Sequence, residues 1–166
     1  MPVPSQPIVI LGGFLIDPPA YAPMAGALER LSGQSVQLVP VGKAEWTLTV
    51  FAFAWARILD RVALTVDKLA RSSPTGRVTL IGHSSGGIML RLFLDDRPFQ
   101  GRCYDGKVLA DTLVMLGSPQ TALRATVLRQ MVHRRLPGAT FSPQVHYLSV
   151  AGDLDLAQGS PMARRL

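Results

Sequence analysis

A serine lies among closely spaced glycines near the middle of the chain, in the segment Gly-His-Ser-Ser-Gly-Gly at residues 82–87. A short apolar run precedes the segment, and an apolar stretch with helical spacing follows it. This context predicts a sharp turn from a strand into a helix, in which a side chain at Gly82 or Gly86 would collide with its neighbours. The turn would lift the Ser84 hydroxyl clear of the sheet, beside the positive end of the helix. Ser84 is therefore our candidate nucleophile for attack on an acyl carbonyl.

The same turn allows two other interpretations. A glycine-rich turn between a strand and a helix need not do any chemistry, because G-x-S-x-G also occurs by chance. Glycine-rich turns also bind nucleotide phosphates. The chain lacks both G-x-x-x-x-G-K-[ST] and G-x-G-x-x-G, together with the lysine that would neutralise a phosphate, so we do not expect a nucleotide.

A second glycine pair follows the first apolar run, in Leu-Gly-Gly-Phe at residues 11–14. An acyl-transfer serine needs N–H groups aimed at the developing oxyanion. Both glycine turns leave the carboxyl ends of predicted strands, the edge at which open α/β sheets bind ligands. We therefore expect the N–H groups of Phe14 and Ser85 to form an oxyanion hole, with an ordinary Gly-Gly turn as the alternative.

Strand and helix patterns alternate along the chain. Near-continuous apolar runs predict strands covered on both faces at residues 8–11, 36–39, 78–81, 112–116 and 146–150. Helical spacing predicts helices at residues 21–31, 46–71, 85–95 and 121–136, and residues 98–107 are expected to be a surface excursion. The sequence thus predicts a single α/β domain over residues 1–166, built on a doubly wound, mostly parallel sheet. Residues 50–55 are assigned to helix core packing, with the lining of an acyl pocket as the alternative.

Three motifs together resemble the lipase and esterase branch of the α/β-hydrolase superfamily. They are residues 11–14, residues 82–86 and Leu-Gly-Ser-Pro at residues 116–119, in that order. The chain is most similar to the small lipase-like proteins of cyanobacteria and plastids, where a histidine often follows the third motif and Gln120 stands here. The resemblance implies an α/β-hydrolase fold and hydrolysis of esters through Ser84.

A nucleophilic serine also needs a histidine base and an acid, which follow the serine in this superfamily in the order acid, then histidine. None of the histidines is a convincing base, because His83 lies inside the turn, His133 lies on a basic helix and His146 begins a strand. Asp155 is a weak candidate for the acid, and no histidine follows it.

The resemblance accounts for these missing partners. Relatives usually continue for another strand and helix beyond the segment that corresponds to residues 162–166, and their acid and histidine usually come from that continuation. We therefore expect the chain to be incomplete at its C-terminus, without its last strand and helix. Such a loss would leave residues 147–150 as an exposed apolar edge.

Composition narrows the class of protein further. Hydrophobic residues make up 48% of the chain, which excludes disorder. The single cysteine, Cys103, cannot form an internal disulfide and is expected to be a structural thiol. The N-terminus lacks the basic start of a signal peptide, and residues 46–59 contain Arg57 and are too short to span a bilayer, so we expect a soluble cytoplasmic protein. No metal cluster or cofactor motif is present, and we predict neither.

Positive charge is concentrated late in the chain, whose net charge is +6. No acidic residue lies between Asp111 and Asp153, a stretch that contains Arg124, Arg129, Arg134 and Arg135. The helix that carries this charge is expected to present a solvated face, with contact to an anionic membrane or an acidic substrate as the alternative. No nucleic acid is expected, because no binding motif accompanies the charge.

The function predicted from the sequence is hydrolysis of carboxylic esters, on a small-molecule or lipid substrate. A non-catalytic, degenerate hydrolase that binds a lipid, a membrane surface or a protein is the main alternative. An acyltransferase with the same serine turn is a third.

Overall fold

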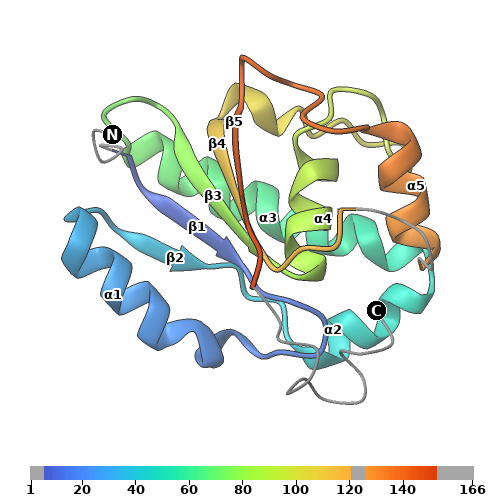
Figure 1. Cartoon of the computed structure of the whole chain (residues 1–166), viewed down its shortest axis with the longest axis horizontal. Helices are drawn as coiled ribbons and strands as arrows, with labels where there is room; N and C mark the ends of the chain where they lie inside the picture. The colour runs from blue at the N-terminus through green and yellow to red at the C-terminus, as the bar shows by residue number, and fades with distance from the viewer. Residues whose placement is uncertain (1–5, 121–125, 153–166) are drawn as a thin grey trace.

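Five parallel strands form one sheet in the computed structural model of the chain, which describes residues 6–120 and 126–152 (Figure 1). The strand order is β2-β1-β3-β4-β5. The strands are β1 (Ile8–Leu11), β2 (Val36–Leu38), β3 (Val78–His83), β4 (Ala110–Leu116) and β5 (His146–Val150). The chain leaves β1 toward one edge of the sheet and returns to the other side of β1, so the carboxyl ends of β1 and β3 adjoin, and Leu11 pairs with Gly82. Ligands bind to open α/β sheets at such a reversal of strand order.

Helices cover both faces of the sheet. One face carries α1 (Ala22–Ser32), and the other carries α3 (Phe53–Ser72), α4 (Ser85–Phe93) and α5 (Val127–Arg135) (Figure 1). Alternate residues of β1 point to the two sides, since Ile10 packs in the cluster with α1 and Val9 in the larger cluster with α3 and α4. The predicted doubly wound α/β sheet is confirmed.

The prediction of one continuous helix at residues 46–71 is wrong. Residues 43–72 form α2 (Lys43–Thr47), the 3-10 turn η2 (Leu48–Val50) and then α3. The Thr49 hydroxyl donates to the Trp46 carbonyl over 2.6 Å, and the Trp55 indole N–H donates to the Thr49 carbonyl over 2.7 Å. These side-chain bonds, with the low helix propensity of β-branched residues, account for the break.

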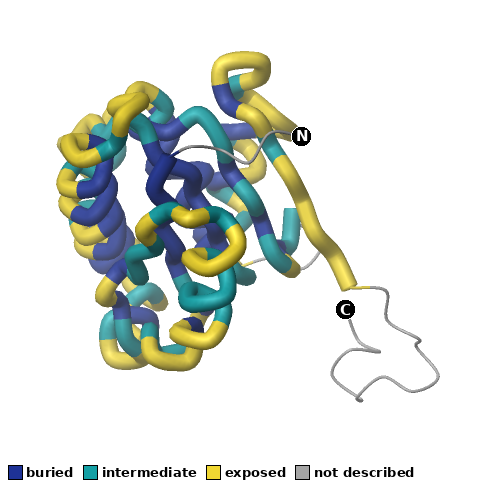
Figure 2. The backbone as a smooth tube through the Cα atoms, turned by 90° about the vertical axis from the view of Figure 1, so that its left-hand side faces the viewer, coloured by how far each residue is buried: buried dark blue, intermediate teal, exposed yellow. Residues whose placement is uncertain are grey.

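The expectation that every strand is covered on both faces is wrong for β5. Leu148 and Val150 are 56% and 46% exposed, and Figure 2 shows most of β5 as exposed at the side of the molecule. Both residues pair with β4 on the face that carries α1, but α1 packs against β2 and β1 at the other end of the sheet. No other described helix covers that face at β4 and β5.

The remaining elements follow their predicted positions closely. A 3-10 turn, η1 (Pro18–Tyr21), precedes α1, and another, η3 (Gly106–Val108), lies at the end of the surface excursion. Part of the predicted helix at residues 121–136 lies outside the described residues. No helix in the described part of the chain is both long and apolar enough to cross a bilayer.

Candidate active site

Ser84 forms the junction between β3 and α4 in a strained backbone conformation. Its φ is 51° and its ψ is −121°, a combination that residues with a side chain rarely adopt. Its N–H donates to the Leu116 carbonyl over 2.9 Å, and its own carbonyl accepts the Gly87 N–H over 3.1 Å. These bonds hold the strained turn, and the Ser84 hydroxyl makes no hydrogen bond within the described residues.

The glycines around Ser84 are required by close backbone approaches. A Cβ atom at Gly82 would lie closer than 3.0 Å to the backbone of α4, and one at Gly86 would lie that close to the Leu11 and Gly12 carbonyls. The turn is thus packed directly against the loop that follows β1. A Cβ at Gly87 would collide with Ser118, whose hydroxyl donates to the Gly82 carbonyl over 3.4 Å. The Gly-Ser-Pro turn after β4 therefore supports the serine turn from behind.

The two predicted oxyanion donors lie on the adjoining loops. Phe14 follows the Gly12-Gly13 pair at the end of β1, and Ser85 is the first residue of α4. Neither the Phe14 N–H nor the Ser85 N–H donates a hydrogen bond to another described residue. Both amides are therefore available to an acceptor beside Ser84.

Tyr21 joins these two loops, and the sequence analysis did not single it out. Its buried hydroxyl accepts the Gly13 N–H over 2.8 Å and lies 2.8 Å from Nδ1 of His83. The ring also contacts Gly12, where a Cβ would collide with it. A tyrosine shortly after a glycine-rich loop is the only sequence signal, and it gives no hint of contact with a residue 62 positions away.

A cavity of about 710 Å³ opens beside Ser84. Its wall is mostly apolar, and its lining includes Phe14, Trp46, Val50, Trp55 and Leu128. The assignment of residues 50–55 to core packing is therefore wrong in part. Trp55 is buried, but it also lines the cavity, and Val50 is 73% exposed at the cavity wall. The Trp46 indole N–H is buried without a partner in the described part of the chain.

Arg91 joins α4 to the segment that follows α5. The side chain is buried on α4, and it donates to the Leu136 and Gly138 carbonyls just after α5 and to the Gln120 side chain. Burial lowers the pKa of the Arg91 guanidinium, and no carboxylate within the described residues pairs with it. Gln120, which follows the Gly-Ser-Pro turn, accepts a hydrogen bond from Arg91 over 2.9 Å and so joins this turn to α4.

The predicted basic helix does not present all of its charge to solvent. The Arg135 guanidinium pairs with the buried Asp95 carboxylate, which also binds Arg97 over 3.0 Å. Burial alone would raise the pKa of Asp95, but the hydrogen bonds from both arginines outweigh it and hold that pKa below 3.8. Arg129 instead lines the Ser84 cavity, and Arg124 lies outside the described residues.

No histidine in the described residues is placed to act as the base for the Ser84 hydroxyl. His146 pairs with Thr112 at the amino end of β5, four residues and about 13 Å from the pairing of Val150 with Leu116, next to the serine turn. His133 is exposed in the last turn of α5, about 9 Å along the helix from Val127 at the cavity. His83 is engaged by Tyr21. Asp155 lies outside the described residues.

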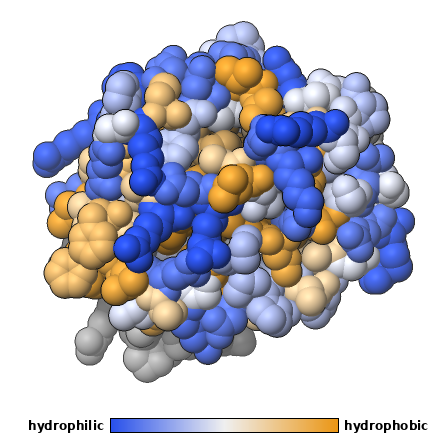
Figure 3. All heavy atoms as spheres, turned by 180° about the vertical axis from the view of Figure 1, so that it is seen from behind, coloured by the Kyte–Doolittle hydropathy of each residue, from blue (hydrophilic) through white to orange (hydrophobic). Residues whose placement is uncertain are grey.

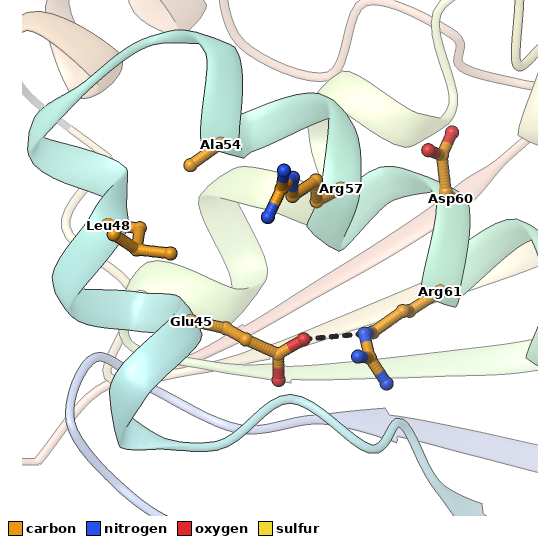
Figure 4. A pocket seen from close by; sticks show the side chains of 6 residues that line it. All are labelled: Glu45, Leu48, Ala54, Arg57, Asp60 and Arg61. Carbon is orange, nitrogen blue, oxygen red and sulfur yellow. Dashed lines mark ion pairs between the residues drawn. The ribbon is translucent and has the colours of Figure 1, made fainter.

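A second, smaller hollow of about 270 Å³ lies over α2 and the start of α3 (Figure 4). Glu45 points toward Arg61, and their charged groups are 2.6 Å apart. Arg57 and Asp60 complete a charged lining in which no serine, cysteine or histidine takes part. In addition, no group of three or more metal-ligating side chains occurs in the described segments. The Ser84 cavity is therefore the candidate active site.

Comparison with known proteins supports the class of fold. No protein-family model and no curated protein sequence matches the chain. An acetylxylan esterase structure matches 88% of the chain, over 82% of its own, with a TM-score of 0.53 at 13% identity. A protein from Xanthomonas campestris pv. campestris, described as a hydrolase of the α/β superfamily, matches 89% of the chain over 87% of its own length. The TM-score is 0.52 and the sequence identity is 14%.

A cutinase from Trichoderma reesei, in complex with a phosphonate inhibitor, matches 91% of the chain over 62% of its own, with a TM-score of 0.50 at 16% identity. At such identities the likeness shows the fold. The chain therefore has an α/β-hydrolase-like fold, as the three sequence motifs predicted.

Proposed function

We propose that the chain is a serine hydrolase of carboxylic esters with Ser84 as its nucleophile. The observation that carries this proposal is the strained Ser84 turn at the wall of an apolar cavity. Backbone strain of this kind costs about 1–3 kcal/mol and persists only where the surroundings impose it. A turn with no catalytic role would gain nothing from strain that costs this much free energy.

The proposed reaction has two steps. The Ser84 oxygen attacks the acyl carbonyl, and the resulting oxyanion is held by the Phe14 and Ser85 N–H groups. The tetrahedral intermediate then breaks its bond to the alcohol, which leaves with the proton that the Ser84 hydroxyl gave to the base on attack, and an acyl-serine remains. Water attacks the acyl-serine in the same way and releases the acid. The apolar cavity favours an apolar acyl group.

A base is also required, because serine is a weak nucleophile at neutral pH. We assign it to a group that the described residues do not identify, since none of His83, His133 and His146 lies in position beside the Ser84 hydroxyl. Asp155 stays the candidate for the acid that orients the base. The cytoplasmic location expected from the sequence also stays a prediction.

A fluorophosphonate probe tests the proposal, because it labels activated serines covalently. We expect the wild-type protein to be labelled at Ser84, and Ser84→Ala to remain unlabelled. Ser72→Ala, at the end of α3, is the matched control and should label as the wild type does. Absence of labelling in the wild type, or equal labelling of Ser84→Ala, would refute the nucleophile.

A second candidate function is a non-catalytic binding protein with the same cavity. The distance of His133 and His146 from the serine turn favours it, because a serine without a base is inert. Under this alternative the probe leaves Ser84 unlabelled, while an apolar dye such as a naphthalene sulfonate still binds in the cavity.

A further inference from the structure

Exposed apolar side chains surround the mouth of the Ser84 cavity. We call this set the apolar rim; its members are between 43% and 74% exposed, and they are Phe14, Leu15, Val50, Phe51, Phe53 and Val127. Phe14, Val50 and Val127 line the cavity itself, and Leu15 and Phe51 are their neighbours in the chain, so the rim adjoins the opening. Clustered exposure of this kind marks an interaction surface in a soluble domain, whereas single exposed apolar residues need no explanation.

The most prominent part of the rim is a pair of phenylalanines between η2 and α3. The rings of Phe51 and Phe53 are stacked, with centroids 5.7 Å apart and an angle of 15° between their planes. They remain 56% and 57% exposed, so stacking on each other does not remove them from water. Since the break between α2 and α3 is fixed by the Thr49 hydroxyl and the Trp55 indole, both rings are held outward by the fold.

Positive charge lies beside the rim. Arg129 lines the cavity next to Val127, and Arg134 is exposed on the same helix; neither makes an ion pair within the described residues. The described residues from 126 to 152 contain no Asp or Glu. The acidic groups near the other side of the mouth, Asp17 and Glu45, are paired with Lys43 and Arg61. Figure 3 shows hydrophobic side chains gathered at the left edge of that view, beside strongly hydrophilic ones.

We propose that the apolar rim docks on an anionic lipid surface, with the mouth of the cavity turned toward the lipid. The boundary between headgroups and acyl chains takes apolar side chains, and its phosphates attract arginines. A rim of aromatic and aliphatic side chains with unpaired arginines beside it matches both layers. The charge that the sequence assigned to one basic helix thus acts through Arg129 and Arg134, because Arg135 is bound to Asp95.

Vesicle co-sedimentation with the Ser84→Ala protein tests this surface. The variant removes any turnover, so the result does not depend on whether the proposed hydrolysis occurs. We expect binding to vesicles that contain phosphatidylglycerol and much weaker binding to phosphatidylcholine alone, with a loss as salt is added. Phe51→Ser and Phe53→Ser should each lower the partition constant about tenfold. Arg129→Gln should weaken binding to the anionic vesicles only.

Matched controls distinguish the rim from general hydrophobicity. Leu31 on α1 and Leu64 on α3 are 81% and 73% exposed but lie away from the mouth. Leu31→Ser and Leu64→Ser should bind vesicles as strongly as the parent protein. The proposal is overturned if these controls lose as much binding as Phe51→Ser, or if no vesicle is bound. It is also overturned if the phenylalanine variants abolish self-association or capture of a protein while leaving vesicle binding intact.

Discussion

The Tyr21 hydroxyl lies 2.8 Å from Nδ1 of His83 and at the same time accepts the Gly13 N–H. Burial raises the pKa of the Tyr21 phenol, so the hydroxyl keeps its proton at neutral pH. Because Gly13 is the donor in one bond, the phenol proton is free for the other, and Nδ1 of His83 accepts it in the tautomer that carries the ring proton on Nε2. The loop after β1 and the serine turn after β3 are therefore joined by one side chain.

Replacement of Tyr21 by Phe should slow ester hydrolysis without preventing folding. The ring would still fill its site, but Gly13 would lose its acceptor and the Phe14 amide its fixed position. We expect kcat to fall about tenfold, as for a partly misplaced oxyanion donor, with KM changed less than about twofold. The loss of unfolding free energy should be about 1–2 kcal/mol. Steady-state kinetics and urea unfolding measure both quantities.

Tyr104→Phe is the matched control for this substitution. The Tyr104 hydroxyl bonds to Asp60 over 2.9 Å and to the Ala56 carbonyl over 3.2 Å, and neither partner belongs to the serine turn or the loop after β1. Its loss should affect stability but not kcat. An equal fall of kcat in both variants would mean that Tyr21 acts only through general stability.

Gly86→Ala should destabilise the protein by about 1–3 kcal/mol, the usual cost of forcing an atom into a packed site. The new methyl group would be closer than 3.0 Å to the Leu11 and Gly12 carbonyls, which are backbone atoms and cannot swing away. At Gly152 the same change meets open space and should be neutral. Urea unfolding of both variants checks this expectation. Equal stability of the two would show that the loop after β1 is not packed against the serine turn.

Because of Asp95, the free energy of unfolding should fall as the pH is lowered. Its pKa is held below 3.8 in the folded state, so the unfolded chain takes up the proton more readily. The contribution of Asp95 is therefore complete above about pH 5 and is lost as the pH falls through 3.8 toward the folded value. At neutral pH, Asp95→Asn should cost about 3 kcal/mol, because Arg135 would lose a buried partner. The unfolding free energy of this variant should depend less on pH between 5 and 3 than that of the wild type.

Asp67→Asn provides the comparison for this carboxylate. Asp67 forms an exposed ion pair with Arg71 one helical turn away, and such a pair contributes about 0.5 kcal/mol or less. Its removal should leave the acid transition unchanged. If Asp95→Asn keeps the acid transition of the wild type, carboxylates other than Asp95 cause that transition.

Ser84→Gly should raise the stability of the protein, whereas Ser84→Ala should not. Glycine adopts a φ of 51° at little cost, while alanine keeps the strain. We expect a net gain of about 1 kcal/mol, after the higher entropy of glycine in the unfolded chain is subtracted. Thermal unfolding of the two variants measures the difference directly. Equal melting temperatures would show that the turn is relaxed.

Local signals in the sequence were sufficient to predict the parallel sheet and the turn at Ser84. The first and fifth predicted strands coincide with β1 and β5, because short apolar runs bounded by turn residues have few alternatives. Gly82 and Gly86, two positions on either side of Ser84, signal the close backbone approaches that the turn makes. The break between α2 and α3 was missed because the Trp55 indole supplies one of its bonds from the next helix.

Contacts between distant segments were beyond sequence reasoning. The pairing of Tyr21 with His83 depends on how η1 crosses the end of β1, which no pattern of residue types encodes. The exposure of Leu148 follows from where α1 lies on the other half of the sheet. An apolar strand looks the same in sequence whether one or both of its faces are covered.

The carbonyl of Leu116 holds the Ser84 turn, and Ser118 supports it from a position 36 residues after Gly82. A ribosome releases the serine turn well before it releases either of these supports. Until β4 pairs with β3, the nascent chain therefore carries Ser84 as an ordinary, unstrained serine. The strained conformation of Ser84 therefore requires the chain out to Ser118, and a chain that ended before β4 would lack it.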